Sequence, residues 1–336
     1  MEWQYKRFVE IDFVRSVAIV IMIVANTFPY LGGFDPSPVF RVTMSFAAPL
    51  FIFLTGISSY YRNDRKIIGL VSNLAIISSA VCIDVFVWKI VPFETFDVLY
   101  VIGLGGLVQL LLPNRFGLHV ILGFLFFSLA LVFQFFEFYR FEFEETNLGF
   151  FYGIHFSNLL QRLLIDGWFP IFPWMGFAFL GRAFIIKKNK TDAFLKKARL
   201  PVLLVFTLLF IIYSNLISTG LRMGYVETFY PANGPYLLMA LVWILTILAI
   251  TPAINKGIPD NFFIMGKFSM TIYVMHAIVN AYGFEKAGWQ ISGWSYFFAM
   301  ILLVFAFMIF SLWLDRVSRG NGFARLPIFL RKMLGV

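Results

Sequence analysis

The sequence predicts an all-α membrane protein, a bundle of about ten or eleven transmembrane helices. Of its 336 residues, 60% are hydrophobic and only 13% are charged, and 44 are Phe. Soluble domains carry about twice that fraction of charge. The apolar residues also fall in runs of about 20, the length that a helix needs to cross a bilayer. We therefore expect the chain, 1–336, to form a single transmembrane domain.

Each predicted span is one apolar run, bounded by charged residues, Gly or Pro. The ten runs lie at 13–31, 39–60, 66–88, 96–113, 116–136, 168–186, 200–218, 234–254, 262–283 and 291–313. The segment 137–167 is the one substantial piece outside the membrane, and its stretch NLLQRLLIDGW predicts an amphipathic helix at the interface. A further helix within 150–167 would raise the count to eleven.

The charges of the connecting loops predict the orientation. The loops at 61–66, 114–115 and 182–199 and the tail after Leu314 are basic, whereas 137–149 has four Glu against one Arg. Loops rich in Lys and Arg face the cytoplasm, so ten spans leave both termini inside. We expect a multi-pass protein of the cell membrane.

The composition also limits the function. The net charge of +9 lies in those loops, which indicates contact with the anionic lipid bilayer and not with nucleic acid. The single cysteine, Cys82, excludes a disulfide framework, and three dispersed histidines give no credible metal site. No P-loop, HExxH, GxSxG or CxxC motif occurs. Any chemistry must therefore take place within the bundle.

Polar residues inside the spans are costly and are therefore functional candidates. His276 lies about 14 residues, or roughly 20 Å, from the predicted cytoplasmic end of its helix. Asn26 lies about as deep in the first helix, which runs in the same direction, and Asn280 follows His276 by one turn on the same face. His276 is then either a packed histidine with one hydrogen bond or a general base. Asp12 and Arg15, one turn apart at the headgroup level, can form an ion pair.

Five motifs occur in an order that resembles a known enzyme family. They are EIDFVRSVAIVIMIVAN at 10–26, PLFIFLTGIS at 49–58, FDVLYVIGL at 96–104, FPIFPWMGFAFLG at 169–181 and FSMTIYVMHAIV at 268–279. Their order resembles the heparan-alpha-glucosaminide N-acetyltransferase catalytic family, with its bacterial and archaeal relatives in the wider transmembrane acyltransferase superfamily. The resemblance implies an enzyme that passes an acetyl group from cytoplasmic acetyl-CoA to an amine or hydroxyl of a sugar or glycan on the far side. It is also compatible with a homodimer.

The sequence departs from this family at two places. The Gly that follows the Arg of the family signature is Ser16 here, and the loop 27–40 lacks the histidine that is proposed to be active in the heparan enzyme. Three interpretations follow: His276 takes the role of the base, the acceptor needs no strong base, or this member is not an active acetyltransferase.

The acetyltransferase hypothesis assigns a role to each candidate residue. His276 is the expected base, and Asn26 is the expected donor to the thioester carbonyl or the oxyanion. The resemblance places Asp12 and Arg15 at the inner mouth. The full set expected to bind CoA is Asp12, Arg15, Arg62, Arg65, Lys66, Arg182, Lys187 and Lys188. The set expected to bind the acceptor is Asp97, Arg162, Asp166, Trp168, Trp174 and Asn280.

Two other functions are compatible with the same features. Pro170 and Pro173 predict an interrupted sixth helix that borders a cavity, and such helices with a midplane polar cluster also suit a transporter of a small polar or lipidic solute. The two halves show no repeat, which is atypical of transporters. The third alternative is a structural or lipid-interacting subunit without chemistry.

Overall fold

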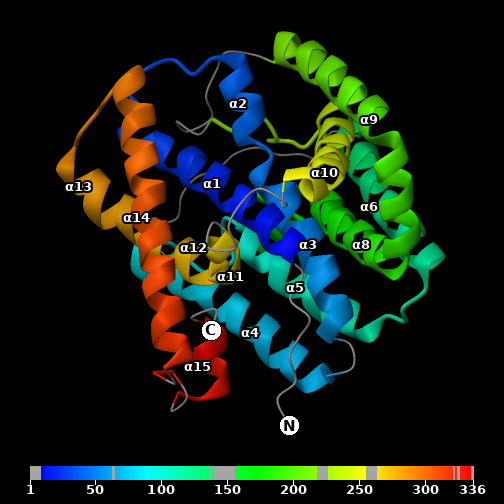
Figure 1. Cartoon of the computed structure of the whole chain (residues 1–336), viewed down its shortest axis with the longest axis horizontal. Helices are drawn as coiled ribbons and strands as arrows, with labels where there is room; N and C mark the ends of the chain where they lie inside the picture. Colours follow the sequence, from blue (N-terminus) through cyan, green and yellow to red (C-terminus); the bar gives the residue numbers. More distant parts are fainter. Residues whose placement is uncertain are drawn as a thin grey trace.

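The computed structural model describes residues 9–62, 65–136, 138, 156–217, 226–254, 263–320, 322–323 and 326–333. These residues form helices joined by short connections, and the prediction of an all-α membrane bundle is confirmed (Figure 1). The first helices are α1 (Val9–Leu31), α2 (Pro38–Met44), α3 (Ala47–Arg62), α4 (Lys66–Cys82), α5 (Val98–Leu111), α6 (Phe116–Phe135) and α7 (Phe156–Gln161). The others are α8 (Ile171–Ile186), α9 (Lys188–Leu216), α10 (Gly234–Ile254), α11 (Ile264–Lys267), α12 (Ser269–Ile278), α13 (Glu285–Ala287), α14 (Trp294–Arg319) and α15 (Ile328–Met333). Three π-helical segments continue helices: η2 (Ile83–Trp88), η4 (Arg162–Asp166) and η6 (Val279–Phe284).

The ten apolar runs all correspond to helices, but not all of these are continuous. Among the described residues, seven helical segments are long and apolar enough to cross a membrane. They are Glu10–Leu31, Pro38–Arg62, Lys66–Trp88, Phe116–Phe135, Lys188–Leu216, Gly234–Ala253 and Trp294–Arg319. An eighth would be α8 taken with the helical turns before it, bent by 53°. The fourth run forms the short helix α5, of 14 residues, and the ninth is divided among α11, α12 and η6.

The predicted outer helix overlaps α7 and η4, which precede α8 directly. Residues 139–155 of the same segment lie outside the described residues. The location of this helix at a membrane interface remains a prediction.

Two helical segments, α1 and α2–α3, form the centre of the bundle. In the most apolar stretch of α2–α3, 78% of residues are buried, and in α1 61%, compared with 11% in α9 and 22% in α6 and α14. Helix α1 packs against α3, α10, α11, α12 and α14, and it crosses the middle of the bundle in Figure 1. Polar side chains of α1 therefore face protein, whereas α6, α9 and α14 present apolar side chains outward, as lipid contact requires.

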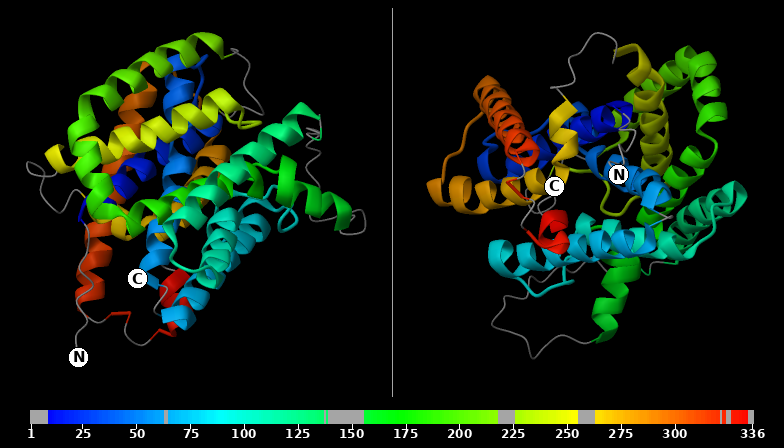
Figure 2. Two further views of the ribbon diagram at one scale, coloured as in Figure 1. Left: turned by 90° about the vertical axis from the view of Figure 1, so that its right-hand side faces the viewer. Right: turned by 60° about the horizontal axis from the view of Figure 1, so that its bottom comes forward.

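The two ends of the bundle differ in charge. The start of α1, the connection between α3 and α4, and α15 lie at one end, which we call the basic end, and α15 packs against α4 there (Figures 1 and 2). The connections 89–97, 226–233 and 288–293 lie at the other end, which we call the loop end. A short backbone pairing between Gly32–Gly33 and Ile291 ties the end of α1 to the loop before α14.

Two glycines bring α3 and α8 into backbone contact. A Cβ atom on Gly56 would lie 1.9 Å from the carbonyl oxygen of Ala178, and one on Gly181 would lie 1.9 Å from that of Phe53. Transmembrane helices pack closely where small residues let their backbones approach. This contact holds the second half of α8 against the middle of α3.

We expect Gly181→Ala to destabilise the protein, because the new methyl group meets a backbone oxygen that cannot move aside. Overpacking of this kind costs roughly 1–3 kcal/mol, although Gly→Ala in a helix is otherwise favourable by up to about 1 kcal/mol. The measurement is the thermal unfolding temperature in detergent. The control is Gly105→Ala, whose methyl group meets its nearest neighbour, Met175, at 3.8 Å. Equal unfolding temperatures for the two variants would contradict this packing.

Candidate active site

Two cavities lie in line inside the bundle, and three residues separate them. The loop-end cavity, of about 60 Å³, contains Asn26 and His276 in its wall, and the basic-end cavity, of about 220 Å³, contains Arg15. The side chains of Phe51, Val98 and Tyr273 line both cavities. We call these three residues the partition. They place the predicted polar pair directly beside the boundary between the two cavities.

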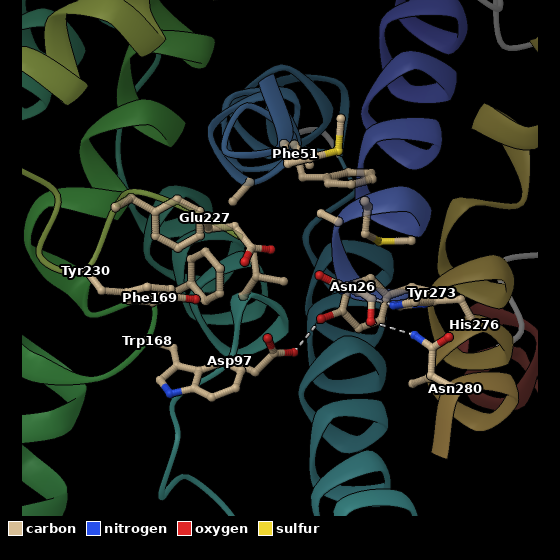
Figure 3. Close-up of a pocket in the computed structure, with 18 of the residues that line it drawn as sticks. Asn26, Phe51, Asp97, Trp168, Phe169, Glu227, Tyr230, Tyr273, His276 and Asn280 are labelled. Atoms are coloured by element: carbon tan, nitrogen blue, oxygen red, sulfur yellow. Dashed lines mark hydrogen bonds between the residues drawn. The ribbon is translucent and has the colours of Figure 1, made fainter. Parts of the chain in front are cut away.

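Asn26 and His276 are in hydrogen-bond contact, as their equal predicted depth suggested. The Nδ2 atom of Asn26 lies 3.1 Å from Nε2 of His276 (Figure 3). His276 is buried, and its ring packs edge-on against Tyr273 with centroids 5.0 Å apart. With the amide as donor, Nε2 carries the lone pair and the imidazole is neutral, which is the form that a general base needs.

Asn280 holds α1 against η6. It accepts a hydrogen bond at Oδ1 from the hydroxyl of Thr27 (3.1 Å), and its Nδ2 donates to the backbone carbonyl of Asn26 (2.9 Å). The residue lines the loop-end cavity, but its amide is committed to these two contacts. These contacts position Asn26, and the substrate contact expected from the sequence stays a prediction. The π-helical turn that carries it is a feature often found at functional sites.

Ser16, where the family signature has Gly, makes a similar contact between helices, nearer the start of α1. Its hydroxyl donates to the carbonyl of Asp12 (2.9 Å) and accepts from the backbone N–H of Gly266 (2.9 Å). The Arg15 guanidinium donates to Asp12 (3.3 Å), to the hydroxyl of Ser58 (3.2 Å) and to the carbonyl of Gly266 (3.4 Å). The start of α1 is thus attached to α11 by side chain and backbone.

Asp97, in the wall of the loop-end cavity, holds Tyr273 of the partition in place. The Tyr273 hydroxyl donates to Oδ2 of Asp97 at 2.6 Å, and both side chains are buried (Figure 3). Asp97 precedes the first residue of α5, so this contact joins α5 to α12. Asp97, which the sequence predicts to bind the acceptor, therefore also supports the partition.

A second carboxylate in this cavity, Glu227, was missed by the sequence analysis. It lies in the connection between α9 and α10, where the flanking backbone is anchored: Arg41 Nε donates to the carbonyl of Val226 (3.1 Å), and Thr228 N–H donates to Ser45 Oγ (2.8 Å). Figure 3 shows the Glu227 carboxylate facing Asn26 and His276 across the cavity. Burial raises the pKa of Glu227 to about 7, and its own backbone N–H and the charge of Arg41 partly oppose that rise.

Aromatic rings form much of the remaining wall. Trp168 and Phe169 line the cavity, and their backbone N–H groups donate to Thr95 and Phe96, which attaches the start of α8 to the connection 89–97. Trp168 is also shared with a third cavity, of about 350 Å³, at the loop end. This outer cavity shares Tyr30, Trp88 and Trp168 with the loop-end cavity. Aromatic rings therefore lie between the outer cavity and the loop-end cavity.

Cationic side chains surround the basic-end cavity. It is lined by Arg15, Arg62, Lys267 and Lys332. An adjoining cavity of about 460 Å³ shares Arg62 and Lys332 and adds Arg65 and Arg331. Burial and the nearby charges of Arg62 and Arg331 lower the pKa of Lys332. This repulsion among cations is what a bound phosphate would relieve.

Several of the cations expected to bind CoA have other partners. Arg182 is fully buried and donates to the backbone carbonyl of Gln109. Two of its nitrogens, Nη2 and Nε, donate to Oδ1 of Asn114 at 2.7 and 2.9 Å. Lys188 pairs with Glu10 and Asp192. The cations of the expected set that line neither basic-end cavity are Lys66, Arg182, Lys187 and Lys188. These four cations are therefore poorly placed for a phosphate bound in either cavity. The Asp12 carboxylate pairs with Arg15 and orients it.

Some of the expected acceptor-binding residues line the loop-end cavity, and the others do not. Trp168 and Asp97 line the loop-end cavity with Asn280, as described above. Arg162 forms an ion pair with Glu94 (3.0 Å), and Asp166 accepts from Gln161 Nε2 (2.7 Å), so both support the outer connection. Trp174 is buried behind the wall, against Phe169 and Phe229.

We expect Arg182→Lys to lower the unfolding temperature and leave the affinity for acetyl-CoA unchanged. A lysine cannot reproduce the forked contacts of the guanidinium to Asn114 and the α5–α6 connection, and a lost buried hydrogen bond costs roughly 1–3 kcal/mol. The exposed cation Lys187, replaced by Met, is the control for both measurements. A weaker acetyl-CoA affinity in a normally stable Arg182→Lys protein would return Arg182 to the binding set.

Comparison with known proteins supports one family. The family model described as "Heparan-alpha-glucosaminide N-acetyltransferase, catalytic" matches residues 7–217. The match contains Asn26, Asp97 and Trp168 but ends before Glu227 and His276. No curated protein matches the chain. Among the described residues, no group of His, Cys, Asp or Glu side chains is arranged to hold a metal ion.

Proposed function

Because the chain belongs to the heparan-alpha-glucosaminide N-acetyltransferase catalytic family, we propose that it moves an acetyl group across the cell membrane. The donor is cytoplasmic acetyl-CoA, and the acceptor is an amine or hydroxyl of a sugar or glycan on the other side. The observation that carries this proposal is the pair of in-line cavities. One is basic, the other is acidic and aromatic, and they meet beside Asn26 and His276.

The basic end is the side on which acetyl-CoA enters. Loops rich in Lys and Arg face the cytoplasm, where acetyl-CoA is available. The cations around the two basic-end cavities match the phosphates of CoA, and charge-assisted hydrogen bonds to phosphate are strong. The proposed phosphate-binding residues are Arg15, Arg62, Arg65, Lys267, Arg331 and Lys332. The acetyl end of the donor then extends toward the partition, away from the cations.

The acetyl group is transferred at the Asn26–His276 pair. The acceptor displaces the amide of Asn26 from Nε2 of His276, so that the imidazole receives the proton of the attacking amine or hydroxyl. The freed Nδ2–H of Asn26 donates to the oxyanion of the tetrahedral intermediate. When this intermediate collapses, the carbon–sulfur bond breaks, and the CoA thiolate leaves and takes the proton from His276. Direct transfer in a ternary complex needs no covalent acyl-enzyme.

We expect His276→Ala to lower kcat about 10²- to 10⁴-fold, the usual contribution of a general base. For Asn26→Ala we expect a loss of about 10²- to 10³-fold, the usual contribution of one oxyanion donor. The assay follows labelled acetyl-CoA with purified protein in lipid nanodiscs and a panel of amino sugars and neutral sugars. The matched control is His119→Ala, because His119 is a buried histidine that lines neither cavity. Undiminished transfer by His276→Ala would rule out the proposed base.

We expect Arg62→Ala and Lys332→Ala to weaken acetyl-CoA binding about tenfold each, which corresponds to about 1.4 kcal/mol. The loss should shrink at high salt, where exposed charges are screened. Binding is measured by calorimetry with acetyl-CoA and with dephospho-CoA. Arg319→Ala is the control, since this exposed cation of the basic end pairs with Asp315 and lines neither cavity. If the wild-type protein binds no acyl-CoA, the enzyme proposal fails and a transporter becomes the better interpretation.

A further inference from the structure

The loop-end cavity is acidic on the wall that faces the reacting pair. Asp97 and Glu227 both line it, and its described lining residues include no Lys or Arg. The two carboxylates differ in their contacts. One oxygen of Asp97 accepts the hydrogen bond of Tyr273, whereas Oε2 of Glu227 has no hydrogen-bond partner among the described residues.

An unpaired buried carboxylate oxygen is costly, because it has lost its hydration without a replacement. Glu227 is only 8% exposed, and the hydrogen bonds to Val226 and Thr228 on either side of it hold its backbone in place. The Glu227 carboxylate as a whole faces the cavity, across from Asn26 and His276 (Figure 3).

We propose that Glu227 determines acceptor specificity: its carboxylate accepts a hydrogen bond from a hydroxyl or ammonium group next to the reacting atom, and it excludes acceptors that carry a carboxylate or phosphate there. The inference rests on the proposed acetyltransferase function and adds a residue and a selection rule to it. Asp97 contributes to the exclusion, since like charges in a poorly hydrated cavity repel strongly.

The selectivity should depend on pH, because the charge of Glu227 does. Its pKa of about 7 means that the carboxylate is mostly neutral at pH 6 and mostly charged at pH 8. Rejection of anionic acceptors should therefore strengthen as the pH rises through 7. The titratable and charged groups that surround Glu227 or line its cavity are Arg41 on α2, Tyr213 on α9, Tyr236 on α10, Tyr296 on α14, Tyr30 on α1, Tyr273 and His276 on α12, and Asp97 and Tyr230 in the loops.

The test compares two matched pairs of acceptors that differ by one carboxylate. Glucosamine is compared with 2-amino-2-deoxyglucuronic acid for transfer to nitrogen, and methyl glucoside with methyl glucuronide for transfer to oxygen. The second pair has no group that titrates between pH 6 and 8, because the carboxylate of methyl glucuronide stays ionised, so a pH effect in that pair reports on the protein. We expect wild type to favour the uncharged or cationic member at least 100-fold in kcat/KM at pH 8. We expect Glu227→Gln to reduce this preference at least tenfold and to weaken its pH dependence, with an unchanged KM for acetyl-CoA.

Two further variants separate charge from shape and from folding. Glu227→Asp keeps the charge and should keep the preference, even where its overall rate falls. Glu94→Gln changes another buried acid of the loop end, one that pairs with Arg162 and does not line the cavity, and should leave the preference unchanged. An unaltered preference in Glu227→Gln, or equal use of both members by wild type, would overturn the inference. Failure of wild type to acetylate any sugar would instead overturn the proposed function, and the inference with it.

Discussion

The attachment of α1 to α12 and η6 by polar side chains is the constraint on which the rest of the site depends. In an apolar bundle, a buried amide or imidazole without a partner is expensive, so these groups must meet one another. Asn26 contacts His276, and Asn280 contacts both Thr27 and the backbone of Asn26. Since helix–helix association in a membrane gains nothing from the hydrophobic effect, such contacts and close packing decide which faces meet.

The charged side chains are divided between the two sides of this polar pair. Cations gather around the basic-end cavity, carboxylates face the loop-end cavity, and Phe51, Val98 and Tyr273 separate the two. A polyanionic donor and a sugar acceptor would therefore be sorted by charge to opposite sides of the polar pair.

Structural and chemical roles overlap in several residues. Tyr273 belongs to the partition, supports His276 by ring contact and is held by Asp97. The Arg182 guanidinium binds the α5–α6 connection, although an arginine at its predicted depth could bind a phosphate. A charged residue in a membrane protein is thus a functional candidate whose partner has to be identified before a role is assigned.

The sequence by itself determined the helical bundle, the position of the apolar runs and the shared depth of Asn26 and His276. These features are local: a run of apolar residues has to be helical in a bilayer, and the rise of a helix converts residue number into depth. Which side chains face the cavities was decided only by the tertiary structure. Glu227 lies in an irregular loop folded inward by contacts to α2, and Lys267 and Lys332 reach the basic-end cavity from distant segments. Neither periodicity nor charge count carries that information, because it depends on how separate helices pack.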